Sequence, residues 1–122
     1  LSPFSEPETC ALRDFLLDLN SRSLAPRVLI FHSSTRRVNG EVYPGGDESI
    51  KMAEIYASSA GYDVEYSWKE YVTSGEAVTW CAEQNIAALD IVIPSGQSPY
   101  SRVQDNYTLV DITVKALNSI VQ

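Results

Sequence analysis

Short apolar segments that alternate with stretches of helical periodicity constrain the fold of this chain most. Residues 28–31 are continuously apolar, which is typical of a strand covered on both faces. In residues 62–68 apolar and polar side chains alternate, which indicates a strand exposed on one face and therefore at a sheet edge. Residues 89–93 form a third strand segment, and Pro94 ends it. Because the intervening stretches are helical, the strands need crossover connections, and the sheet is predicted to be mainly parallel.

Three stretches outside these strands have apolar residues at helical spacing. A capping box at Ser5–Glu8 opens the first helix, and a second box at Thr73–Glu76 opens the third. Asp47 caps the second helix, which is expected to end at Gly61. The residues expected to face the core are Leu12, Phe15, Leu16 and Leu19 in the first helix, Ile50, Ala53, Tyr56, Ala57 and Ala60 in the second, and Ala77, Val78, Cys81 and Ala82 in the third.

The last segment fits two patterns. Apolar residues of 109–120 fall at helical spacing, whereas every second residue from Thr108 to Val114 fits one face of a strand. We favour the helix, because its pattern covers more of the segment and Thr108 with Asp111 can cap it. A fourth strand near residues 107–114 is the alternative.

These elements predict an α/β fold over residues 1–122, as one small domain with three layers. Right-handed crossovers place the strand of residues 28–31 in the middle of the sheet, so the expected strand order is 2-1-3, numbered along the chain. If residues 107–114 join the sheet instead, the fold becomes an α+β sandwich.

Three features together predict a secreted protein. The sequence starts at Leu1 and not at methionine, which suggests a processed terminus. Asn106 begins an N-glycosylation acceptor pattern. Cys10 and Cys81 are the two cysteines, and we expect a disulfide between them that fastens the first helix to the third. The net charge of −7 makes nucleic acid an unsuitable partner, and no apolar run has the length of a membrane helix.

Polar loops follow the first and third predicted strands. In parallel sheets the ligand crevice lies beyond the carboxyl ends of the strands, so both loops are expected to border it. Hydroxyl groups and arginines in these loops suit an anionic ligand, although hydroxyls after a buried strand more often satisfy their own backbone. The candidate ligand-binding residues are Ser33, Ser34, Thr35, Arg36, Arg37, Ser95, Gly96, Ser98 and Tyr100. His32, the single histidine, is interpreted as a packed or surface imidazole.

The stretches RVLIFHSST, SIKMAEIYASSAGYDVEY and LDIVIPSGQSPY together resemble the first half of a flavodoxin-like domain. That resemblance implies that the first loop holds the phosphate of FMN and that an aromatic residue of the later loop covers the flavin. The same stretches are also similar to the amino-terminal half of class I glutamine amidotransferase-like proteins. Their catalytic cysteine would lie on a further strand, and neither cysteine of this sequence occupies such a position, so no nucleophile carries over.

The sequence contains no histidine pair, cysteine cluster or calcium-loop pattern, so no metal or catalytic residue is predicted. Our leading hypothesis is a small secreted α/β protein that acts by binding, either like a toxin or effector or as one subunit of a larger assembly. The alternative is a reduced flavodoxin-like domain that binds FMN or another phosphate-bearing ligand. Tyr62, Tyr66 and Trp68 on the predicted edge strand are the interface candidates. We expect a second chain, either another copy or a different protein, to cover that edge.

Overall fold

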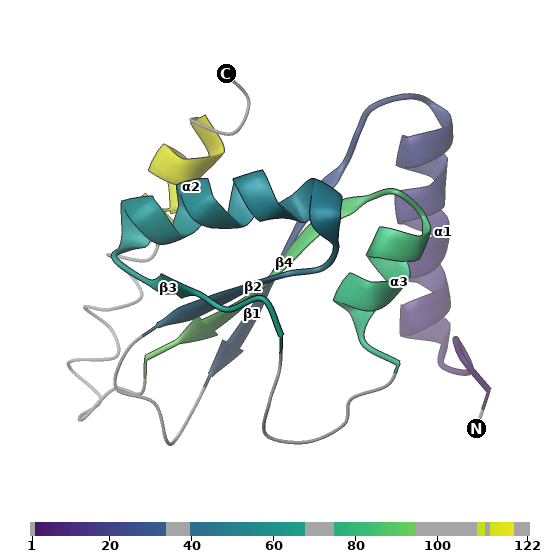
Figure 1. Ribbon diagram of the computed structural model, residues 1–122. Coiled ribbons are helices and arrows are strands. Elements are labelled where there is room, and N and C mark those ends of the chain that lie inside the picture. Colours follow the sequence, from purple (N-terminus) through teal and green to yellow (C-terminus); the bar gives the residue numbers. More distant parts are fainter. Residues whose placement is uncertain (1, 34–39, 68–74, 95–109, 112, 119–122) are drawn as a thin grey trace.

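The computed structural model describes residues 2–33, 40–67, 75–94, 110–111 and 113–118 (Figure 1). In chain order its elements are α1 (Pro7–Ser21), β1 (Arg27–Ser33), β2 (Glu41–Pro44), the short 3-10 helix η1 (Asp47–Ser49), α2 (Ile50–Ala60), β3 (Asp63–Val64), α3 (Ala77–Glu83) and β4 (Ala87–Ile93). Residues 110–111 and 113–118 are also helical, and we call them the C-terminal helix.

The sheet has four strands in the order β1-β4-β2-β3, and it is mixed but mostly parallel. β1 and β4 run parallel, with Arg27 opposite Ala87 and Ser33 opposite Ile93. β2 pairs with β4 in the antiparallel direction, and β3 runs parallel to β2. The α/β class and the mostly parallel sheet predicted from the sequence are therefore confirmed.

The predicted strand order 2-1-3 is wrong, because β1 lies at one edge and not in the middle. The cause is β2, a strand that the sequence pattern does not predict. Its four residues are too few to show a period, yet they occupy the far side of β4. The strand predicted at 62–68 does lie at an edge, but it shortens to the two residues of β3.

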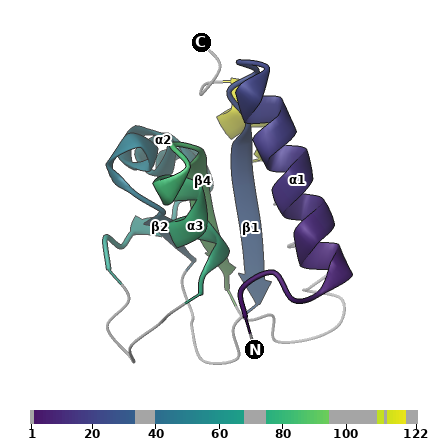
Figure 2. The ribbon, with the colours of Figure 1, turned by 90° about the vertical axis from the view of Figure 1, so that its right-hand side faces the viewer.

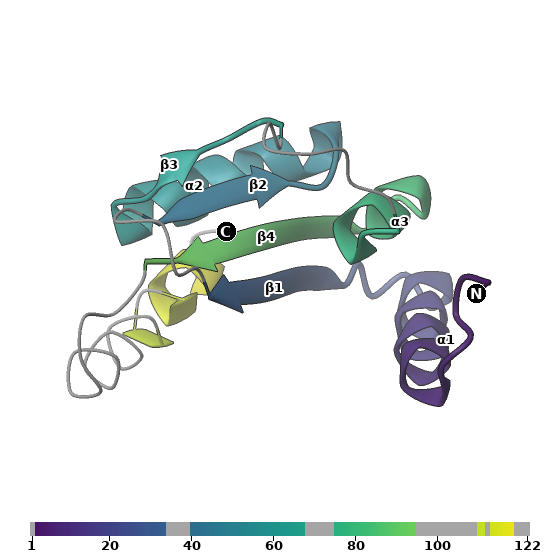
Figure 3. The same ribbon diagram turned by 90° about the horizontal axis from the view of Figure 1, so that it is seen from below.

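Helices cover both faces of the sheet, and each face has its own core (Figures 1 and 3). Successive side chains of β4 point to opposite faces, so Leu89 and Ile91 join one core and Ala88 joins the other. The first core contains α2 and the C-terminal helix, through residues such as Tyr56 and Ala116. The second contains Leu16 of α1 and residues of α3. Figure 2 shows α1 running beside β1.

The predicted C-terminal helix is confirmed for the residues that the structure describes there. Ala116 is fully buried in the first core, and the Tyr56 hydroxyl lies 2.9 Å from Oγ1 of Thr113. The alternative, a fourth strand at 107–114, is not formed by the described residues of that range, which are helical.

The three predicted helix starts differ from the structure. The N-cap of α2 is Ser49, and Asp47, the predicted cap, is the first residue of η1. The N-cap of α1 is Glu6 and not Ser5, whose hydroxyl donates instead to the Glu6 carboxylate at 2.8 Å. The N-cap of α3 is Glu76, and neither cap makes a side-chain hydrogen bond to the backbone. At the end of α2 the prediction is correct, since Gly61 takes the left-handed conformation with φ of 70°.

The predicted disulfide between Cys10 and Cys81 is absent, because both cysteines are free. Their helices do share one layer, as expected. However, the Cys10 thiol donates to the carbonyl oxygen of Phe4 at 2.9 Å, while Cys81 is buried in the second core. Burial raises the pKa of the Cys81 thiol, and the nearby Asp90 carboxylate raises it further. One of the three features that predicted secretion is thus lost.

Candidate functional site

The predicted ligand crevice falls mostly outside the described residues. Of the candidate ligand-binding residues, the structure describes only the backbone of Ser33, the last residue of β1. The others lie outside it, namely Ser34, Thr35, Arg36, Arg37, Ser95, Gly96, Ser98 and Tyr100, as does the predicted glycosylation site Asn106.

A histidine and a carboxylate meet at this end of the sheet. Nε2 of His32 on β1 lies 2.7 Å from Oδ1 of Asp90 on β4. Parallel register and side-chain alternation put both residues on the face that carries Ile30 and the second core. The imidazole is half-exposed and Asp90 is partly buried. A carboxylate that fixes one ring nitrogen leaves the other able to accept or donate a proton, so the pair has acid–base capacity.

The sequence placed His32 at a strand end but did not reveal its partner. The available signal was Asp90 itself, a charged residue inside the otherwise apolar segment 89–93. Within the described part of the chain, no group of three or more histidine, cysteine, aspartate or glutamate residues is arranged to hold a metal ion.

The outer edge of β1 is a second notable surface. Within the described residues β1 pairs with β4 alone, so no described strand covers its other side. Phe31 of β1 is 42% exposed, and on α1 the exposed fractions are 53% for Leu12 and 58% for Phe15. The C-terminal helix adds three exposed apolar side chains at helical spacing, Val110, Val114 and Leu117. We call the outer edge of β1, together with the exposed apolar residues of the two helices that pack on either face of the sheet, the β1 edge surface.

Half of the apolar face predicted for α1 is not buried, and its exposed residues belong to the β1 edge surface. Leu16 packs in the second core together with the β1 residues Val28 and Ile30, so α1 is anchored beside the strand. Leu12 and Phe15, which the periodicity also assigned to the core, remain in solvent. A helix whose apolar face is wider than the core that it covers is typical of an interaction site.

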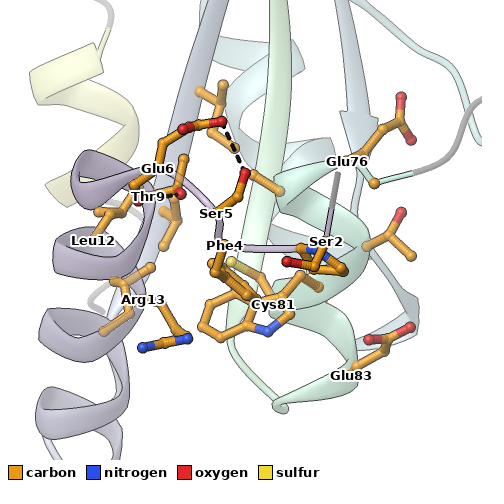
Figure 4. A pocket seen from close by; sticks show the side chains of 18 residues that line it. Ser2, Phe4, Ser5, Glu6, Thr9, Leu12, Arg13, Glu76, Cys81 and Glu83 are labelled. Carbon is orange, nitrogen blue, oxygen red and sulfur yellow. Dashed lines mark hydrogen bonds between the residues drawn. The ribbon is translucent and has the colours of Figure 1, made fainter.

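A cavity of about 580 Å³ lies between α1 and α3. Its lining is mostly apolar and includes Leu16, Val28, Ile30 and Trp80. The Phe4 ring also contributes to this lining, and Figure 4 shows it between the two helices. The volume is within the range of small-ligand pockets, and no sequence motif indicated it. We call this cavity and its lining the α1–α3 groove.

The predicted aromatic stripe on the edge strand divides in the structure. Tyr62 is half-buried against the first core, with its ring centroid 6.4 Å from that of Tyr56. Tyr66 is 62% exposed, and Trp68 lies outside the described residues. In the described part of the chain, no helix combines the length and apolar character needed to span a bilayer.

Neither a protein-family model nor a curated protein matches this sequence. Among solved structures, the fold is similar to the murein-tripeptide amidase MpaA from Escherichia coli O157, with a TM-score of 0.60 and 22% identity. The match covers 94% of this chain and 43% of the amidase chain, so this chain spans less than half of the amidase's length. The similarity shows an α/β fold that this chain shares with part of the amidase chain.

This match overturns the predicted resemblance to flavodoxin-like and amidotransferase-like domains. The quoted stretches contain apolar strands followed by polar loops and helices, which many α/β folds share. What separates the folds is the antiparallel β2 beside β4, together with the edge position of β1. The resemblance therefore no longer supports an FMN site, and a phosphate-bearing ligand stays a prediction that the described residues do not test.

Proposed function

We propose that this protein acts by binding another polypeptide along β1, as one subunit of a larger assembly. The β1 edge surface is the observation that carries the proposal, because it combines a strand edge that no described strand covers with exposed apolar side chains on β1 and on the two helices. A strand added to such an edge gains main-chain hydrogen bonds, while apolar neighbours supply contact area.

A photo-crosslinking experiment tests the proposal. A photoreactive phenylalanine analogue at Phe31 is expected to crosslink the protein to a second chain in its native extract, and the product's mass shows whether that chain is another copy. The same analogue at Tyr66, which is also exposed but follows β3 at the opposite edge, is the matched control and is expected to give no product.

The charge variant Phe31→Glu sharpens the result. The crosslinker is placed at Phe15, and its yield is compared with and without Phe31→Glu. A carboxylate buried in the interface loses its hydration, so we expect Phe31→Glu to lower this yield at least tenfold. Tyr66→Glu is expected to leave that yield unchanged. Equal crosslinking from both edges, or a crosslinking yield that Phe31→Glu does not change, would contradict binding at β1.

Export and a toxin- or effector-like role remain predictions. Their support is now the acceptor pattern at Asn106, since the disulfide is absent. Glycosidase treatment that changes the mass of the native protein would support export.

A second candidate function is amide-bond hydrolysis by the completed assembly. The hydrogen-bonded pair of His32 and Asp90 favours it, because such a pair can take up and release a proton in amide cleavage. The similar structure is named as a murein-tripeptide amidase, and murein tripeptide is therefore the substrate to test. We expect the assembly to hydrolyse it at least 100-fold faster than the His32→Ala variant of the same assembly, following the usual contribution of acid–base catalysis. Activity that is insensitive to His32→Ala excludes this candidate.

A further inference from the structure

The side chain of Phe4 forms part of the wall of the α1–α3 groove, where two other side chains hold its ring (Figure 4). The Arg13 guanidinium stands over the Phe4 ring, 5.0 Å from its centroid. On the other side, the ring meets Trp80 edge to face, with centroids 5.4 Å apart and planes at 72°. Both distances are within the favourable ranges for cation–π and aromatic pairs. The side chains of the groove therefore make favourable contacts with an aromatic ring.

Hydrogen bonds around the Phe4 ring stabilise these contacts. Nε of Arg13 donates to Oδ1 of Asp14 at 2.9 Å, and this hydrogen bond raises the pKa of Arg13, which keeps the guanidinium charged. The Cys10 thiol donates to the backbone oxygen of Phe4 at 2.9 Å. Contacts to both the ring and the backbone of one residue are typical of the recognition of an extended peptide.

Phe4 reaches this position in a disfavoured backbone conformation. Its φ is 59°, in the left-handed region that residues with a Cβ atom rarely adopt. Strained residues of this kind cluster at ligand clamps and switches. A peptide from another chain can place an aromatic ring in the groove without this constraint, so it can compete with Phe4.

We propose that the α1–α3 groove is a peptide-binding site for an aromatic side chain, and that Phe4 is its intramolecular occupant. The ligand is an extended peptide whose aromatic residue lies between Arg13 and Trp80, and whose backbone carbonyl accepts from Cys10. The cavity of about 580 Å³ leaves room beside the ring for neighbouring residues of that peptide. The groove shares Leu12 with the β1 edge surface, but its test rests on Phe4 and Trp80, which lie outside that surface, so each proposal can fail without the other.

The test uses the full chain and its own segment as the probe. The peptide acetyl-SPFSEPE-amide reproduces residues 2–8, and calorimetry measures its binding to the wild type and to Phe4→Ala. We expect Phe4→Ala to bind the peptide at least tenfold more tightly than the wild type, because its groove lacks the competing ring. The matched peptide with alanine in place of phenylalanine is expected to bind neither protein.

Trp80 supplies the second control. In the Phe4→Ala background, Trp80→Ala is expected to weaken peptide binding at least tenfold, while Tyr66→Ala leaves it unchanged. If Phe4→Ala does not fold, Phe4→Leu replaces it, with peptide binding at least threefold tighter than in the wild type. Equal affinities of the wild type and the folded variant, or binding that does not depend on Trp80, would overturn the proposal.

Discussion

Tyr56 joins two helices through a single buried hydroxyl. Its side chain is fully buried in the first core, and its oxygen lies 2.9 Å from Oγ1 of Thr113 in the C-terminal helix. Burial raises the pKa of Tyr56 above the ordinary value of about 10, although the hydrogen bond to Thr113 offsets part of the rise. Cys81 behaves alike in the other core, where burial raises the pKa of its thiol. Both groups thus hold their protons more tightly in the folded protein than in the unfolded chain.

This difference predicts a loss of stability in alkaline solution. A folded-state pKa above the unfolded value gives a contribution that is complete below the unfolded value and is lost as the pH rises towards the folded one. The free energy of unfolding should therefore be steady up to about pH 8 and should fall above about pH 9. The contribution of the Cys81 thiol is lost first and that of the Tyr56 phenol second, because the ordinary pKa of a thiol is the lower one. Tyr56→Phe is expected to flatten the upper part of this fall and to cost about 1 kcal/mol at pH 7 through the lost hydrogen bond.

Urea unfolding from pH 7 to pH 11 measures both effects. Tyr66→Phe is the control, because Tyr66 is exposed and its replacement leaves the core unchanged. A Tyr56→Phe profile parallel to that of the wild type would show that the buried phenol does not cause the alkaline loss.

At the scale of single elements, the end of α2 offers the clearest test. Gly61 has φ of 70°, and a Cβ atom built there would meet nothing within 4 Å. Gly61→Ala is therefore expected to cost about 1 to 2 kcal/mol through the backbone alone, without a steric clash. Gly61→Asn should cost less, since asparagine tolerates the left-handed conformation better. Chemical denaturation of the wild type and the two variants measures the free energy of unfolding. Equal values would show that the end of α2 takes another backbone conformation without cost.

The elements that the sequence predicted best are those whose pattern repeats several times. In α2 the expected inward residues Ala53, Tyr56 and Ala57 are all buried, because an amphipathic helix of this length shows its period clearly. β2 was missed, because its pairing with β4 comes from the tertiary fold and not from a local pattern. A buried serine contributes to this arrangement, since the Ala88 amide of β4 donates to Oγ of Ser49 at 3.0 Å. A hydroxyl in a turn gives no sequence signal for such a contact.

At the scale of the whole molecule, the class and layering were predictable and the candidate site was not. The alternation of strands and helices led to the α/β sandwich, but the order of strands depended on the undetected β2. Two parts of the site consist of residues far apart in the sequence, the His32–Asp90 pair and the ring contacts of Phe4. Such pairs become visible only after the strands are aligned. The β1 edge surface was missed for a related reason, because periodicity marks an apolar face without showing what covers it.

The position of β4 also has a consequence for the order of folding. β1 and β2 both pair with β4, which follows them in the chain, and Arg27 finds its partner at Ala87. During synthesis, β1 and β2 can therefore pair only after β4 has emerged from the ribosome. Long-range pairing of this kind slows folding, and unpaired strands are prone to aggregate meanwhile. A chaperone that shields β1 during this interval would have to release it before a partner chain could bind the same edge.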